Sequence, residues 1–129
     1  MVVVTGPRID PKSLTAPSGV DVHAYVDELY RHLAACDLAV VQGGLSSCME
    51  LTASRTPFLY FPLKDHFEQD RHVDHRLKRY RAGRRIDYET VSIKEIAAAI
   101  VKEMQRNVDY MVVADDGAAR AAREIAELL

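Results

Sequence analysis

The chain has 129 residues, of which 48% are hydrophobic and 28% are charged. Its 17 Lys and Arg residues nearly balance 19 Asp and Glu residues, which gives a net charge of −2. This length and composition predict one small folded domain and exclude a disordered, collagen-like or low-complexity protein. No apolar run reaches the roughly 18 to 20 residues of a membrane-spanning helix, and no signal peptide is recognisable, so we expect a cytoplasmic protein.

Charge is unevenly distributed along the chain. Between Lys64 and Arg85 there are eight basic residues against four acidic ones, so this stretch carries +4 and the rest carries −6. A solvated helix face is one explanation of the basic stretch. Contact with a nucleic acid, a phosphorylated ligand or an anionic lipid surface is the other.

Short apolar segments alternate with longer segments of helical periodicity, which is the pattern of parallel βα units. Strands are predicted over residues 2–5, 20–25, 38–41, 58–61 and 84–87. Helices are predicted from about residue 27, over 47–54, over 67–81 with Gly83 as the C-terminal cap, after a Ser92–Glu95 capping box, and over 117–128. We therefore predict a Rossmann-like, three-layer α/β domain with about five parallel strands and helices on both faces.

The strongest candidate for a ligand site follows the third predicted strand, in the segment Gln42-Gly43-Gly44-Leu45-Ser46-Ser47. Glycines let a backbone approach a ligand closely, and the free N–H groups of a first helical turn bind phosphate. The Ser46 and Ser47 hydroxyls would add hydrogen-bond donors. The motif is neither a Walker loop nor Gly-x-Gly-x-x-Gly, and an ordinary strand-to-helix turn is the alternative.

Two further groups of polar residues could contact the same ligand. Glu50 lies one helical turn after Ser47, where its carboxylate could accept hydrogen bonds from ribose hydroxyls. Glu68 and Gln69 follow the fourth strand and offer acceptors and donors that suit sugar hydroxyls. A solvated helix surface is the alternative explanation for each.

Metal and nucleophile patterns are weak. The histidines His66, His72 and His75 match no established ligand spacing and lie among cations, so we predict no metal site. Cys36 and Cys48 form no Cys-x-x-Cys motif, and we expect both to be small buried hydrophobic residues. No Gly-x-Ser-x-Gly elbow is present, and the catalytic residue is unknown.

In their order and spacing, these motifs resemble the C-terminal, donor-binding half of the GT-B glycosyltransferases. The resemblance is greatest to the peptidoglycan N-acetylglucosaminyltransferase and the macrolide and sterol glycosyltransferases, and it extends over about residues 2–105. The matching motifs are the aspartate-led strand 37–41, Gly43-Gly44, Ser47, Glu50, Thr56-Pro57, Pro62, Glu68-Gln69, His72 and Ala82-Gly83. The resemblance implies an inverting hexosyltransferase that uses a UDP- or TDP-sugar, with no cofactor and no obligatory metal.

The resemblance also implies roles for individual residues. The diphosphate would lie at Gln42, Gly43, Gly44, Ser46 and Ser47, and the ribose at Glu50. The donor sugar would lie at Glu68 and Gln69, and the base beside Tyr25 and Val26.

The chain departs from the family pattern in several ways. Gln42 and His72 stand where the family usually has His and Asn. An acceptor-binding N-terminal domain and the first βα unit, which carries the central strand, are missing from the sequence. We therefore expect residues 1–129 to be a single partial domain, inactive alone, whether as a fragment, a truncated frame or a split subunit. Without the central strand, segment 2–5 would pair with 38–41 or leave a gap filled by another chain.

Two other functions stay open, a sugar-nucleotide hydrolase or epimerase domain and a non-catalytic α/β accessory subunit. The expected partners are a nucleotide sugar and a separate N-terminal domain or partner chain. No nucleic-acid partner is expected. Self-association and peripheral membrane contact stay open.

Overall fold

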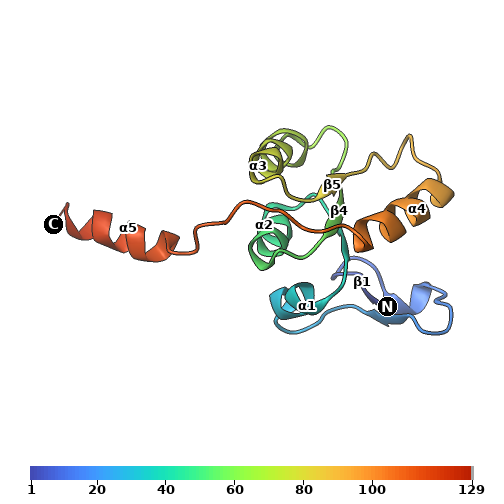
Figure 1. Cartoon of the computed structure of the whole chain (residues 1–129). Helices are drawn as coiled ribbons and strands as arrows, with labels where there is room; N and C mark the ends of the chain where they lie inside the picture. The colour runs from blue at the N-terminus through green and yellow to red at the C-terminus, as the bar shows by residue number, and fades with distance from the viewer. Residues whose placement is uncertain (129) are drawn as a thin grey trace.

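Five short parallel strands organise the fold, as predicted, in a computed structural model that describes residues 1–128 (Figure 1). They are β1 (Val2–Val4), β2 (Asp21–His23), β3 (Ala39–Gln42), β4 (Phe58–Phe61) and β5 (Arg84–Arg85). The helices are α1 (Leu29–Ala35), α2 (Leu45–Ser54), α3 (Asp74–Tyr80), α4 (Ile93–Met104) and α5 (Gly117–Ala126). A single 3₁₀ turn, η1 (Pro11–Ser13), and a π-helical segment, η2 (Glu68–Val73), complete the elements of the described chain.

The strands form two sheets. One contains β1 and β2, and the other has the order β3-β4-β5, with parallel pairing throughout. No ladder joins β1 to β3 within residues 1–128. Of the two arrangements considered for these strands, the structure therefore shows the gap.

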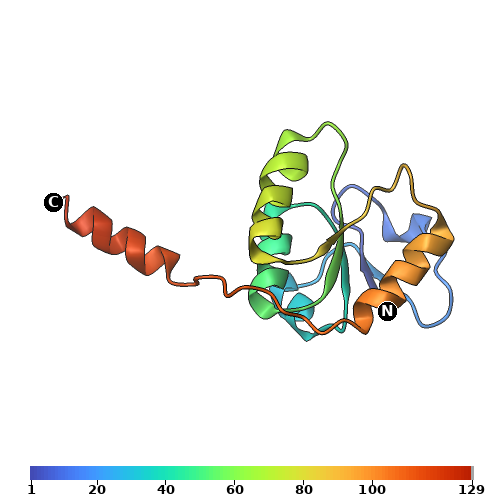
Figure 2. The same cartoon turned by 45° about the horizontal axis from the view of Figure 1, so that its top comes forward.

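Helices cover both faces of the sheets, as predicted. Helices α1, α2 and α3 lie on one face, and α4 lies on the other (Figures 1 and 2). Strand β4 is apolar throughout because both of its faces are covered. Phe58 and Tyr60 pack in the core under α1–α3, and Leu59 packs in the core under α4. Alternate side chains of a strand point to opposite faces, so a covered strand needs apolar residues at every position.

The two cysteines differ in burial. Cys48 is fully buried in the larger core, as predicted, and burial raises the pKa of its thiol to about 12. Cys36 is only half-buried, at the edge of the same core. Because the thiolate is the nucleophilic form, Cys48 stays an inert packing residue at neutral pH.

Several predicted boundaries need correction. Helix α2 begins at Leu45, two residues before the predicted start, while β2 and β5 are shorter than predicted. The predicted helix 67–81 divides into η2 and α3, which ends with Arg81 in the left-handed region at φ 54°. Gly83 is not its cap: Gly83 has φ 63°, and a Cβ there would lie 2.4 Å from Cε2 of Phe58.

Helix α4 starts with the predicted capping box, in which Ser92 Oγ accepts from Glu95 N at 3.3 Å and Glu95 Oε2 accepts from Ser92 N at 2.8 Å. The chain then crosses back, and Tyr110 packs edge-on against Phe58. Beyond it, α5 projects away from the body and buries none of its residues (Figure 2). The sequence pattern also predicts Leu129 on one apolar face with Ile125 and Leu128, but Leu129 lies outside the described residues. None of the described helices has the length and apolar character needed to cross a membrane.

Candidate functional site

The Gly43-Gly44 segment makes a tight turn from β3 into α2. Gly43 N donates to Phe61 O of β4 at 3.3 Å, and Gly44 N donates to Gln42 O at 2.7 Å. These bonds fix the turn at the carboxyl end of the three-stranded sheet, which is where ligands bind in open α/β folds.

The first turn of α2 leaves backbone donors unused. The first intrahelical bond runs from Cys48 N to Gly44 O at 3.1 Å, and no described residue accepts from the N–H groups of Leu45, Ser46 or Ser47. Gly44 caps the helix without a side chain, and the first turn holds no acidic residue. Together with the helix dipole, this arrangement favours an anion.

The two glycines are constrained differently. A Cβ on Gly43 would lie 3.1 Å from Pro62 Cα, so packing against the loop after β4 favours glycine there. A Cβ on Gly44 would meet nothing within 4 Å, and its φ of −69° suits any residue. Neither packing nor backbone conformation within the chain requires glycine at position 44.

Ser46, Ser47 and Glu50 share the exposed side of α2 near this turn. Ser46 and Glu50 are exposed and Ser47 is half-buried. Positions three or four apart on a helix are neighbours, so Glu50 stands one turn behind the two serines. The structure thus places Gly43, Gly44 and these three residues close together, and their roles in binding stay a prediction.

Glu68 and Gln69 both lie in η2 near the same region, but the Glu68 side chain is exposed and the Gln69 side chain is buried. Gln69 is 7% exposed, and its Oε1 accepts from Leu63 N at 2.9 Å, so this oxygen orders the loop after β4. Glu68 is exposed and lines a groove that also contains Leu45 of α2. Both residues lie on a π-helical turn, an irregularity that is frequent at functional sites.

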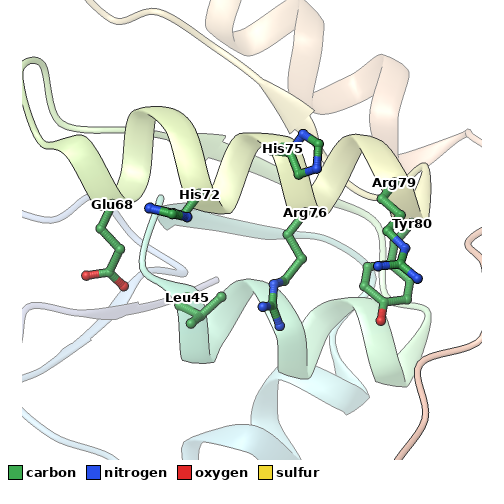
Figure 3. Close-up of a pocket in the computed structure, with 7 residues that line it drawn as sticks. All are labelled: Leu45, Glu68, His72, His75, Arg76, Arg79 and Tyr80. Carbon is green, nitrogen blue, oxygen red and sulfur yellow. The ribbon is translucent and has the colours of Figure 1, made fainter.

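The groove has a volume of about 420 Å³ and runs between α2 and the η2–α3 helix (Figure 3). Glu68, His72 and Arg76 reach from the upper helix toward α2. The residues that line the groove are Leu45, Glu68, His72, His75, Arg76, Arg79 and Tyr80. The sequence interpretation missed the contribution of Arg76, Arg79 and Tyr80 to this groove, although the basic stretch between residues 64 and 85 was the signal.

A polar network around the buried Tyr60 and Asp74 holds the η2–α3 helix on the sheet. Asp74 accepts from Tyr60 OH at 2.8 Å and pairs with Lys78 Nζ at 2.7 Å, while Arg85 of β5 pairs with Asp70. Burial opposes ionisation of Asp74, but the hydrogen bonds from Lys78 and Tyr60 outweigh it and lower the pKa of the carboxyl. Burial and the bond to Asp74 raise the pKa of Tyr60.

Tyr25 and Val26 follow β2, in the other sheet. Tyr25 is 75% exposed, Val26 is half-buried, and the Tyr25 hydroxyl donates to Asp27 Oδ1 at 3.4 Å. No hydrogen bond among the described residues links either residue to the glycine turn. Their assignment to the base stays a prediction.

The histidines do not gather around one point. In residues 1–128, no three His, Cys, Asp or Glu side chains come together in a group that could hold a metal ion. His66 Nδ1 instead accepts from Gln69 N at 3.5 Å, and His72 packs edge-on against Phe67.

The profile of the glycosyltransferase family 28 C-terminal domain matches residues 3–129. The chain belongs to this family. An uncharacterized glycosyltransferase of Methanosarcina mazei is 28% identical over 98% of the chain and 32% of its own length. One of Methanopyrus kandleri is 33% identical over 81% of the chain and 30% of its own length. The chain thus spans about a third of the length of these relatives.

A solved structure supports the fold. The glycotransferase of kitacinnamycin superposes with a TM-score of 0.63 at 24% identity, over 98% of this chain and 30% of the other. The chain is therefore a Rossmann-like α/β domain of glycosyltransferase family 28.

Proposed function

We propose that the chain binds the nucleotide-diphosphate sugar, a UDP- or TDP-sugar, of an inverting glycosyltransferase. The observation that carries this proposal is the start of α2. Three consecutive N–H donors lack an internal partner among the described residues. They follow Gly44, where a Cβ would meet open space and which neither packing nor backbone conformation requires to be glycine. A diphosphate lying against Gly44 accounts for both features.

In this proposal, successive parts of the donor bind first to the glycine turn and then along α2. The diphosphate accepts from the backbone N–H groups after Gly43 and Gly44 and from the Ser46 and Ser47 hydroxyls, and Gln42 adds a side-chain donor. Glu50 accepts from the ribose hydroxyls one turn further along the helix. Tyr25 and Val26 face the base.

The sugar would lie toward η2. Glu68 is the exposed acceptor of the pair and contacts the sugar hydroxyls directly. Gln69 acts partly through the loop after β4, because its Oε1 accepts from Leu63 N. Glu68 also reaches the groove that starts at Leu45, which connects the sugar site to the first turn of α2.

The chemistry follows from the charge that develops on the leaving group. An acceptor hydroxyl attacks the anomeric carbon from the opposite side, and the nucleoside diphosphate leaves with an added negative charge. The dipole and N–H groups of α2 stabilise that charge, so an obligatory metal is not part of the proposal. The acceptor site and the catalytic base, which takes the proton of the attacking hydroxyl, belong to the remaining two-thirds of the enzyme. We therefore propose that the chain alone binds donor without transferring it.

Calorimetric titration of the chain with UDP, TDP and GDP tests the proposal. We expect UDP or TDP to bind and the Glu50→Ala variant to bind it at least about tenfold more weakly, the loss of about 1.4 kcal/mol expected for a charged hydrogen-bond acceptor. Glu124→Ala, which removes an exposed glutamate of α5, should leave the affinity unchanged.

Absence of binding by all three nucleotides would refute a donor site in this chain. Binding that Glu50→Ala, Ser46→Ala and Ser47→Ala leave intact would favour an accessory subunit with a different site.

A further inference from the structure

A second cavity lies at the outer edge of the three-stranded sheet, beside β5. It has a volume of about 430 Å³ and is bounded by β5, by the end of α3 and by the segment after α4. None of the described residues that line it belongs to the glycine turn, to α2 or to η2. The cavity is therefore separate from the proposed donor site.

The lining of this cavity is cationic. Five of its described residues carry a positive charge, and one, Asp74, carries a negative charge. The cations come from α3 and its C-cap, from β5 and from the turn after α4, and they are Lys78, Arg81, Arg84, Arg85 and Arg106. A solvated helix face does not account for this convergence, because Arg106 lies outside the basic stretch between residues 64 and 85.

Two buried carboxylates hold cations at the cavity. The Asp74 side chain is 10% exposed and pairs with Lys78 Nζ at 2.7 Å and with Arg85 Nη1 at 3.6 Å. The Glu103 side chain is 3% exposed and pairs with Arg106 Nη1 at 2.8 Å. In each pair the cation is the more exposed partner, so positive charge faces outward. The pairs also restrict the side chains, which lowers the entropy that ligand binding costs.

The burial of Glu103 is not explained by packing. Ala99 lies one turn earlier on the same side of α4 and packs with Leu59 and Ile86 in the smaller core. A buried carboxylate is costly unless it is paired, and an apolar residue of similar volume usually stabilises as well or better. Within residues 1–128, Arg106 is the only ion-pair partner of Glu103. A role of Arg106 at the cavity accounts for the pair.

Arg81 and Arg84 have hydrogen-bond donors to spare. Arg84 is half-buried on the edge strand and forms no ion pair within the described part of the chain. Arg81 pairs with Asp109 at 3.4 Å, but both side chains are exposed, and such pairs contribute little. A guanidinium carries five N–H donors in a planar fork that matches the oxygens of a phosphate group.

We propose that this cavity binds the phosphate group of a small ligand other than the sugar donor. The five cations face only four carboxylates, those of Asp70, Asp74, Glu103 and Asp109, and Arg84 supplies the excess charge. The cavity volume lies in the usual range of small-molecule sites, so the cavity has room for the phosphate and part of the molecule that carries it.

NMR titration with inorganic pyrophosphate tests the site. We expect the side-chain Nε–H signals of Arg84 and Arg106 to shift and to saturate. Arg81→Gln/Arg84→Gln should weaken binding at least about tenfold, measured on the Arg106 signal, because charge-assisted hydrogen bonds are lost. Neither arginine holds a buried carboxylate, so the melting temperature of this variant should stay close to that of the native chain.

Two control variants locate the bound anion. Arg120→Gln/Arg123→Gln on α5 removes the same charge, and Arg120 has a similarly weak pair, with Asp116 at 3.5 Å. It should leave the affinity unchanged. Ser46→Ala/Ser47→Ala should leave the shift of the Arg106 signal unchanged, which separates this cavity from pyrophosphate bound at the glycine turn.

A vesicle measurement distinguishes a soluble phosphate from a lipid head group. The vesicles contain phosphatidylcholine with phosphatidic acid. Shifts with pyrophosphate assign the site to a soluble ligand. Vesicle binding that Arg81→Gln/Arg84→Gln loses, without shifts from pyrophosphate, assigns it to a head group, and both results support a phosphate site.

Three results would overturn the phosphate site: no response to either probe, unchanged affinity in Arg81→Gln/Arg84→Gln, or an equal loss in the α5 control. The donor site is tested separately, because Arg81→Gln/Arg84→Gln should bind UDP as the native chain does.

Discussion

Gly43 and Gly44 are adjacent, but only one of them is explained by the fold. Gly43 fits against Pro62, whereas Gly44 has ordinary backbone angles and open space where a side chain would project. The sequence could predict that this pair makes a turn into a helix. It could not separate the two glycines, because the difference depends on the loop that follows another strand.

Gly44→Ala should therefore separate folding from binding. We expect the free energy of unfolding to change by less than about 1 kcal/mol, because alanine restricts the unfolded chain but is a poorer helix N-cap than glycine. Nucleotide affinity should fall about tenfold or more, because the new methyl group occupies the space of the diphosphate. Gly117→Ala, where a Cβ also meets open space, is the matched control. Unchanged affinity in Gly44→Ala would argue against a ligand at this turn.

The Tyr60–Asp74 hydrogen bond should make stability depend on acid pH. Since the pKa of Asp74 is lowered in the folded state, its contribution is present above the unfolded pKa of about 3.9 and is lost as pH falls through the lower folded value. Tyr60→Phe removes the donor, so we expect a loss of about 1 to 3 kcal/mol at pH 7 and a smaller loss near pH 2. Urea unfolding at both pH values measures the difference. An equal loss at both values would show that the hydroxyl acts through packing alone.

Among the elements, those defined by local pattern matched the prediction best. Strand β4 follows from an apolar run and α4 from its capping box, both of which lie within a few residues of sequence. The η2–α3 boundary and the role of Gly83 were not predictable in this way. The π-turn accommodates Gln69, which binds the backbone of a preceding loop, and Gly83 is required by Phe58, 25 positions earlier.

Helix α3 presents cations toward the groove rather than pairing all of them. Lys78 pairs with Asp74, but Arg76 and Arg79 form no ion pair among the described residues and line the groove. We propose that these two arginines contact an anionic lipid surface or acceptor. A membrane contact of this kind would be electrostatic and peripheral.

Reversal of both charges tests that contact. Arg76→Glu/Arg79→Glu should weaken binding to vesicles of phosphatidylcholine with phosphatidylserine by roughly thirtyfold or more, at about 1 kcal/mol for each charge removed. UDP affinity should be unchanged. Arg120→Glu/Arg123→Glu on α5 is the control with equal net charge, and vesicle flotation is the measurement. Equal vesicle binding by the native chain and the α3 variant would exclude a lipid contact at α3.

At the scale of the whole molecule, the order of motifs predicted the family and the parallel α/β fold. Chain order alone left two arrangements for β1 and β3, paired or apart. The choice between them depends on hydrogen bonds between segments more than 30 residues apart. Such long-range competition has no local sequence signature.

The segment that follows α4 and crosses back over the body has a practical consequence. Tyr110 packs on Phe58, and Met111 N donates to Tyr80 O at 2.9 Å, which is the last backbone bond to the body within residues 1–128. Beyond it an extended stretch leads to α5, none of whose residues is buried. An endoproteinase that cuts before aspartate should therefore attack Asp115 and Asp116 first, and mass spectrometry should find a resistant fragment ending near residue 114. Its melting temperature should equal that of the uncut chain, which would make this fragment the natural starting point for crystallisation.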